Sequence, residues 1–200
     1  MKKVAITLAG LALLVIIGVS SVIGMRNRLV SAEETVNEAW AQVENVYQRR
    51  ADLIPNLVST VKGYASHERE TLQAVIEARS RIGQVEAQGG ARQALTSPEQ
   101  FSKFEAAQNS LSNALGRLMV VVERYPDLKA NENFLALQSQ LEGTENRIAV
   151  ERRRFNELVR HYNVMIRQFP TSLAAALFGF ERKPFFSMSP GAEQVPQVTF

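Results

Sequence analysis

The chain has 200 residues, with 23 Lys and Arg against 20 Asp and Glu, two His and no Cys. Its formal net charge of only +3 has no dense basic face behind it, so nucleic-acid binding is not indicated. The lack of Cys excludes disulfides, thiol catalysis and lipoprotein processing, and the length suits one domain with a sizeable core.

An uncharged apolar run, VAITLAGLALLVIIGVSSVIGM, occupies residues 4–25 between Lys3 and Arg26. As a helix rising about 1.5 Å per residue it reaches roughly 33 Å, enough to cross a hydrocarbon core of about 30 Å. A cleaved signal peptide is the alternative, but its apolar core spans about 7–15 residues and leads to a small-x-small site. We therefore predict a membrane anchor over residues 1–25, with a transmembrane helix at 4–25.

Two predicted helices follow the run. The first covers 26–64 and is continuous with the anchor; Pro55 should either kink it or cost it a hydrogen bond. Its apolar stripe consists of two rows spaced by seven: Val36, Val43, Leu57 and Tyr64, and Trp40, Tyr47, Ile54 and Val61. The second covers 66–87 and ends before Gly89 and Gly90.

Two more helices complete the pattern. Ser97 is a predicted N-cap, with Pro98 in the first helical position and Gln100 completing a capping box, for a helix reaching Tyr125. The last helix covers 130–169 and is stopped by Pro170. Its heptad positions are Phe134, Leu141, Ile148, Phe155, Tyr162 and Phe169.

These elements predict an all-α fold: an N-terminal single transmembrane helix followed by an antiparallel four-helix bundle over 26–170, with long first and last helices. A coiled-coil dimer through those two long helices is the alternative. Residues 171–186 form a short apolar segment, expected to pack on the bundle or the membrane, and residues 187–200 are expected to be a disordered tail.

Three blocks closely resemble the LemA family: RNRLVSAEETVNEAWAQVENVYQRRADLIPNLVSTVKGYASHE, YPDLKANENFLALQSQLEGTENRI and FNELVRHYNVMIRQFP with the GF and FF that follow. The resemblance extends from the anchor to about Phe186. It implies a bacterial membrane-anchored helical protein with envelope functions and no settled biochemical activity. It also implies a single-pass protein of the plasma (inner) membrane, and a membrane metalloprotease as the partner to test.

Membrane orientation depends on few charges. Lys2 and Lys3 precede the run, and Arg26 and Arg28 follow it. The N-terminal amino group adds to the positive charge that precedes the run. The positive-inside rule therefore slightly favours a cytoplasmic N-terminus and a periplasmic or extracytoplasmic soluble part.

The sequence does not predict catalytic, cofactor-binding or metal-binding residues. His67-Glu68 begins an H-E-x-x-H pattern, but Thr71 stands where the second ligand belongs, and His161 alone cannot replace it. The same stretch faintly resembles a histidine-kinase phosphoacceptor helix, yet no nucleotide-binding motif follows it. We therefore expect no enzyme and no cofactor.

Polar residues interrupt each apolar stripe at a similar distance from the helix ends. Counting turns predicts a layer across mid-bundle in which Glu145, or Glu142, faces Arg50. The candidate layer is Arg50, Arg79, Gln108, Glu142, Thr144 and Glu145, although Ala78 could take the inward place of Arg79. Fixing the register of the helices is the favoured role; a small-ligand or ion site and a simple outward orientation are the alternatives.

A second candidate site is the segment 171–186, because the last helix should return to the bilayer. Aromatic and basic residues favour the headgroup region. The candidate residues are Leu173, Leu177, Phe178, Phe180, Arg182, Lys183, Phe185 and Phe186. Packing of the segment on the membrane-proximal part of the first helix is the favoured interpretation, and contact with the headgroups is the hypothesis to test against it.

Together these features predict a membrane-anchored helical scaffold or partner-binding protein without catalytic activity. The expected partners are membrane lipid through the N-terminal helix, a membrane protein and a second copy of the chain, but not nucleic acid. The alternative is a ligand- or stress-sensing signalling protein that uses the mid-bundle polar layer.

Overall fold

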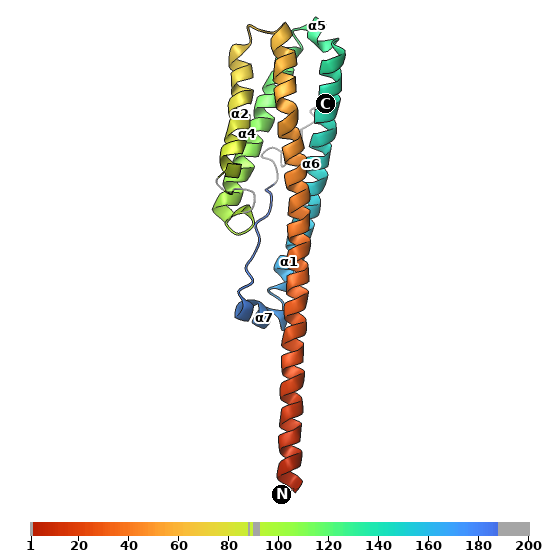
Figure 1. Cartoon of the computed structure of the whole chain (residues 1–200), viewed down its shortest axis with the longest axis vertical. Coiled ribbons are helices and arrows are strands. Elements are labelled where there is room, and N and C mark those ends of the chain that lie inside the picture. The colour runs from red at the N-terminus through yellow and green to blue at the C-terminus, as the bar shows by residue number, and fades with distance from the viewer. Residues whose placement is uncertain (1, 88, 90–92, 188–200) are drawn as a thin grey trace, which may run out of the picture. The chain divides into compact units, whose positions relative to one another are not determined.

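The computed structural model describes residues 2–87, 89 and 93–187, with side chains from residue 8 onward. Regular structure in these residues is helical, without strands, as the predicted all-α class requires. The predicted disordered tail lies outside the described residues except for Ser187. The helices are α1 (Lys2–Tyr64), α2 (Arg69–Ala87), α4 (Pro98–Val122), α5 (Pro126–Lys129), α6 (Glu132–Met165) and α7 (Thr171–Phe178) (Figure 1).

α1 is a single helix of 63 residues, so the apolar run and the first predicted helix are continuous. An 18-residue window within it has a mean hydropathy of 2.4, and none of that window is buried. The run is therefore long and apolar enough to cross a membrane, and no other segment that the structure describes covers it. Pro55 lies inside α1 without ending it.

The start of α4 follows the sequence signals. Ser97 has an extended backbone, and its side-chain oxygen accepts a hydrogen bond from the Gln100 amide at 3.4 Å. Pro98 occupies the first turn, where its missing N–H costs no helical hydrogen bond. The predicted N-cap is confirmed.

The last predicted helix differs from the structure at both ends. Residues 126–129 form the separate turn α5, and the Asn131 side-chain oxygen then accepts from the Phe134 amide at 3.0 Å, so Asn131 caps α6. α6 ends at Met165, which leaves Phe169 79% exposed instead of in the heptad seam. Pro170 disfavours helical geometry in the residue before it, which accounts for the early end.

The chain divides into two compact units. The first unit comprises residues 1–45 and 153–183, and the second comprises residues 46–152 and 184–200. α1 and α6 therefore each contribute one part to each unit, whereas α7 belongs to the first unit and α2, α4 and α5 belong to the second.

The first unit has an aromatic and aliphatic interior. The Trp40 and Phe155 rings lie 5.2 Å apart between centroids, at a tilted angle that suits their quadrupoles. Its other buried apolar residues are Leu29, Val36, Ala39, Val43, Val159, Tyr162, Ile166, Ala174 and Ala175.

The second unit has a larger core to which α1, α2, α4, α5 and α6 all contribute. α2 and α4 pack along each other (Figure 1). Glu68, just before α2, accepts hydrogen bonds from Arg124 at 3.0 Å and from the Tyr125 hydroxyl at 2.9 Å, so the turns at this end are joined. The core includes Ile54, Leu57, Val61, Leu72, Val75, Ile82, Leu111, Leu118, Val122, Leu128, Phe134 and Leu141.

Candidate functional site

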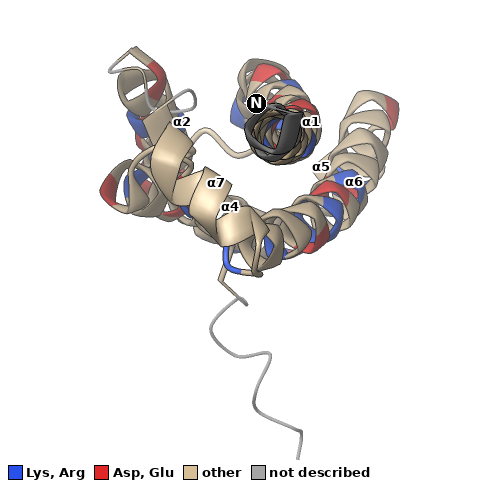
Figure 2. Cartoon of the chain, turned by 90° about the horizontal axis from the view of Figure 1, so that it is seen from below, with Lys and Arg blue, Asp and Glu red and all other residues tan. Residues whose placement is uncertain are grey.

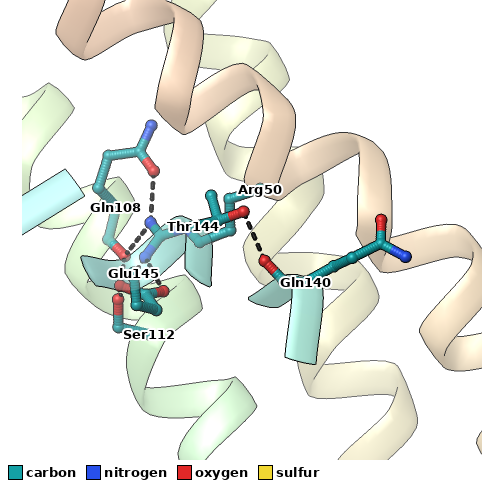
Figure 3. A network of polar contacts seen from close by, with 6 residues as sticks. All are labelled: Arg50, Gln108, Ser112, Gln140, Thr144 and Glu145. Atoms are coloured by element: carbon teal, nitrogen blue, oxygen red, sulfur yellow. Dashed lines mark hydrogen bonds and ion pairs between the residues drawn. The ribbon is translucent and has the colours of Figure 1, made fainter. Parts of the chain in front are cut away.

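A polar cluster lies inside the second unit, centred on Arg50 of α1. Its Nη1 donates to Ser112 Oγ at 2.8 Å and to Glu145 Oε1 at 2.7 Å. Its Nη2 donates to the Gln108 side-chain oxygen at 2.7 Å and to the Gln108 carbonyl at 3.2 Å. Figure 3 shows the guanidinium between Gln108 and Glu145. We call Arg50, Gln108, Ser112 and Glu145 the polar cluster; it links α1, α4 and α6.

Burial within the polar cluster is uneven. The Arg50 side chain is 1% exposed, whereas that of Glu145 is 44% exposed. The ion pair therefore joins a fully buried cation to a carboxylate that still meets solvent. Two buried nitrogens, Arg50 Nε and Gln108 Nε2, have no hydrogen-bond partner in the described part of the chain.

The remaining residues of the predicted layer lie outside this network. The Thr144 hydroxyl is buried but donates to the Gln140 carbonyl of its own helix at 2.7 Å (Figure 3). Arg79 is exposed and donates to the Ala51 carbonyl at 3.1 Å, because Ala78 takes the inward position. Glu142 is also exposed, and accepts from Gln138 one turn earlier in α6.

Ser112 is the member that the sequence analysis missed. It lies four residues after Gln108, so both side chains fall on the same face of α4. That spacing was the available signal. Its hydroxyl is also 3.3 Å from the Gln108 carbonyl, which fits a donor bond back to its own helix while it accepts from Arg50.

Tyr47 lies next to the polar cluster. The Arg50 guanidinium is 5.1 Å from the centre of its ring, a cation–π distance. Burial raises the pKa of the Tyr47 hydroxyl, although Arg152 and Arg50 oppose the change. A neutral phenol therefore faces the charged residues of the cluster over the physiological pH range.

A cavity of about 230 Å³ opens between α4 and α6 beside the cluster. Ser112 and Glu145, which both contact Arg50, form part of its wall. The other lining residues are Leu115, Gly116, Met119, Gln138, Leu141 and Glu142. The apolar lining and the Glu145 carboxylate together suit a small apolar molecule that carries a cation or a hydrogen-bond donor.

The predicted membrane-interface segment divides into two parts. Leu173, Leu177, Phe178 and Phe185 are exposed, as is Arg182, and Phe180 is half-buried. Phe186 instead lies in the interior of the second unit, 4.8 Å from Phe101 between ring centroids. Its ring can pack against other aromatic rings there, so it is not available to a membrane.

Lys183 also differs from its predicted role. Its Nζ forms an ion pair with Glu33 at 2.8 Å, and its side chain is mostly buried. The Lys183 main chain exchanges two hydrogen bonds with the Asn163 side chain, at 2.9 and 3.0 Å. Asn163 is a buried polar residue that no pattern in the sequence singled out.

The two histidines take no part in the polar cluster. His161 lines a cavity of about 480 Å³ in the first unit, together with Arg28 and Ser31. Within the described residues, no group of three or more His, Asp or Glu side chains lies close enough to hold a metal ion.

Comparisons with known proteins show what this chain is similar to in sequence. The model of the LemA family matches residues 39–200. The chain is 30% identical to "Magnetosome protein MamQ" of Magnetospirillum gryphiswaldense over 186 residues, which are 86% of this chain and 68% of that protein. It is 24% identical to "Protein LemA" of Metamycoplasma hominis over 153 residues, 76% of this chain and 64% of that one. Neither name denotes an enzyme.

Proposed function

The chain belongs to the LemA family, and we propose that it is a membrane-anchored helical scaffold that binds a partner protein in the bacterial envelope without catalysing a reaction. One observation carries the proposal. The apolar run of α1 is long enough to span a bilayer, and none of its most apolar 18-residue stretch is buried. Exposed apolar surface on this scale needs a lipid solvent.

In this proposal residues 1–25 anchor the chain and residues 26–170 form an antiparallel four-helix bundle. The polar cluster supports the bundle, because one guanidinium hydrogen-bonds to two other helices through Gln108, Ser112 and Glu145. Its role is to select one arrangement of the helices, since unsuitable registers would leave the buried Arg50 without acceptors. Such a rigid body presents fixed surfaces to a partner.

Membrane fractionation with alkaline carbonate washing tests the anchor. The full chain is expected in the membrane pellet. The double variant Leu14→Lys with Ile17→Lys should lose this association, since each charge at the centre of a span costs about 2.5–3.5 kcal/mol. Leu135→Lys, which places the same charge at an exposed leucine of α6, should remain in the pellet. Recovery of the unaltered chain in the wash would overturn the proposal.

Crosslinking in intact cells, followed by mass spectrometry, tests the scaffold. A dominant membrane protein, such as a metalloprotease, would make the chain an adaptor. Crosslinks between copies along α1 and α6 would make it a homo-oligomeric scaffold. If the chain crosslinks to neither under conditions that capture a known membrane complex, the partner-binding function is wrong.

The side of the membrane can be tested with the same chain, because it has no Cys. We propose an extracytoplasmic soluble part. A single cysteine at the exposed position Val120 should then react with a membrane-impermeant maleimide in intact spheroplasts. Reaction only after lysis would assign the soluble part to the cytoplasm.

Ligand sensing is a second candidate function, favoured by the cavity beside Ser112 and Glu145. A cationic ligand there would compete with Arg50 for the Glu145 carboxylate. A thermal-shift screen of small amphipathic amines tests this function. Gly116→Phe is the control, because a Cβ at Gly116 meets no atom within 4 Å and the ring beyond it should occupy the cavity that Gly116 lines. Equal shifts with and without this change would exclude the site.

A further inference from the structure

α7 has a composition that is unusual for an exposed helix. Its sequence, TSLAAALF, contains no charged residue, and Figure 2 shows the whole helix in the colour of uncharged residues. Leu173 and Leu177 are 65% and 72% exposed. They are four residues apart and so share one face of the helix. α7 therefore presents an apolar face that no described residue covers.

The opposite face of α7 is tightly packed. Ala174 and Ala175 are both buried, and their small side chains allow a close approach to the rest of the first unit. Gly179 ends the helix with a φ of 73°, a left-handed conformation that favours glycine, and the amides of Gly179 and Phe180 both bond to the Ala175 carbonyl. The helix therefore has a defined end.

The chain after α7 is held in place as well. Asn163 hydrogen-bonds to the main chain of Lys183, whose Nζ pairs with Glu33 of α1. Because Ala174 and Ala175 are buried and the chain is held again at Lys183, the apolar face of α7 has a fixed direction within the first unit. It is not a loose apolar peptide.

The position of α7 identifies what meets that face. The Arg26 guanidinium lies 5.5 Å from the centre of the Phe178 ring. Arg26 is the first charged residue after the apolar run of α1, so α7 lies beside α1 at the end of that run (Figure 1). Aromatic rings next to arginines are typical of the headgroup region of a bilayer.

We propose that α7 is an interfacial helix which inserts Leu173, Leu177 and Phe178 into the membrane surface next to the transmembrane part of α1. Arg26, stacked on Phe178, faces the lipid phosphates there. The inference rests on the proposed function, because it requires residues 4–25 to lie in the bilayer. A two-point contact of this kind limits tilting of the first unit relative to the membrane.

Fluorescence quenching in vesicles tests the insertion. The full chain carries one cysteine at a time, at Leu177, Leu173, Ile16 or Val120, and each is labelled with an environment-sensitive dye; no native Cys interferes. The vesicles contain phosphatidylcholine and phosphatidylglycerol, with spin labels at shallow or deep positions of the lipid. Val120 is a matched control, because it is 72% exposed, like Leu177, but lies on α4.

The expected result is a blue shift and loss of intensity at Leu177 and Leu173 with the shallow lipid label, and protection from iodide. Val120 should be quenched by iodide alone. The inference is overturned if Leu177 behaves like Val120, or if Leu177 is protected from iodide but not quenched by lipid, since a protein would then cover α7.

The label at Ile16 distinguishes failure of the interfacial helix from failure of the membrane anchor. Quenching of Ile16 by the deep label, without quenching of Leu177, would leave the anchor in place and reject the interfacial helix. If the lipid labels quench neither position, the membrane anchor itself is wrong.

Discussion

The two units differ in the side chains that fill their interiors and in where large apolar side chains stay exposed. The second unit buries a charged arginine and supplies it with acceptors from α4 and α6. The first unit has an aromatic interior around Trp40 and Phe155 and exposes apolar side chains on α1 and α7. α1 takes part in both units, so one helix carries a polar interior contact and an uncovered apolar surface.

This difference shows that the apolar residues of such a chain cannot all be assigned to the core, nor the charged ones to the surface, from hydropathy alone. In the second unit the outside is aqueous, and a buried charge can specify which helix faces meet. In the first unit part of the outside is proposed to be lipid, so apolar exposure carries no penalty there. Shape complementarity between rings must then specify the packing.

The largest expected effect is that of Phe155→Ala in the first unit. The change removes a fully buried ring that packs on Trp40, and should lower the free energy of unfolding by about 3–5 kcal/mol. Hydrogen exchange of the full chain in micelles would show faster exchange within 26–45 and 153–166. Val164→Ala, at an exposed site of the same helix, is the control. An equal increase throughout 46–152 would show that the two units unfold together.

Glu145→Leu should have the next largest effect, in the second unit. Arg50 would keep a buried charge with neutral acceptors only, at a cost of about 2 kcal/mol, less than for a fully buried pair because Glu145 is half exposed. Urea denaturation measures it. Glu142→Leu, an exposed neighbour, should change stability by less than ~0.5 kcal/mol.

Adding Arg50→Leu to Glu145→Leu should recover most of that loss, since no charge remains buried. If the polar cluster fixes the register of the helices, the same double variant should elute in size-exclusion chromatography with a broader or shifted distribution than the unaltered chain. An elution profile identical to that of the unaltered chain would contradict that role.

Ser97→Ala should have a smaller effect, again in the second unit. The change removes the acceptor for the Gln100 amide and should cost about 1 kcal/mol. Thermal denaturation measures the loss, and Thr96→Ala is the control because the Thr96 hydroxyl only donates to the Gln93 carbonyl. Equal effects of the two changes would mean that the cap does not stabilise α4.

The smallest effect at neutral pH is expected for Tyr162→Phe in the first unit. Burial, together with Glu33 and Glu181, raises the Tyr162 pKa from 10.0 to about 12. A raised pKa contributes stability below the unfolded value, and this is lost as pH rises from 10.0 to about 12. The buried hydroxyl has no partner among the described residues, so the change should cost less than ~0.5 kcal/mol at pH 7.

Urea denaturation at pH 7 and pH 11 measures that difference. The variant should lose less stability than the wild type between the two pH values. Tyr64→Phe, at an exposed tyrosine, is the control. If wild type and Tyr162→Phe lose the same stability, the raised pKa makes no contribution to folding.

Much of the helical framework could be predicted from local signals. Ser97 and Pro98 identify the start of α4, and five of the six heptad positions, from Phe134 to Tyr162, are buried. The sixth position, Phe169, is exposed. Seven-residue spacing places residues on one helix face only within the helix, and α6 ends at Met165. The separate turn α5 was missed because its 4 residues are too few to show a helical period, and the cap at Asn131 lies just inside the predicted start of the last helix.

The candidate site could be predicted less completely. Counting turns gives the level of a residue along a helix, which is why Arg50, Gln108 and Glu145 could be grouped. It does not give the direction of a side chain around the helix, so Arg79 was included although Ala78 faces inward. Nor could it choose between Glu142 and Glu145, which lie less than one turn apart.

The Asn163 contact has a consequence for how freely the sequence can vary. Asn163 binds the peptide groups of residue 183 and not its side chain. The path of the chain after α7 is therefore encoded at position 163, far from the segment that it directs. The side chain at position 183 takes no part in this contact, and here it is a mostly buried lysine that forms an ion pair with Glu33. A saturation library should accept fewer residues at 163 than at 183, because a change at 163 removes both main-chain contacts, whereas most changes at 183 remove only the ion pair.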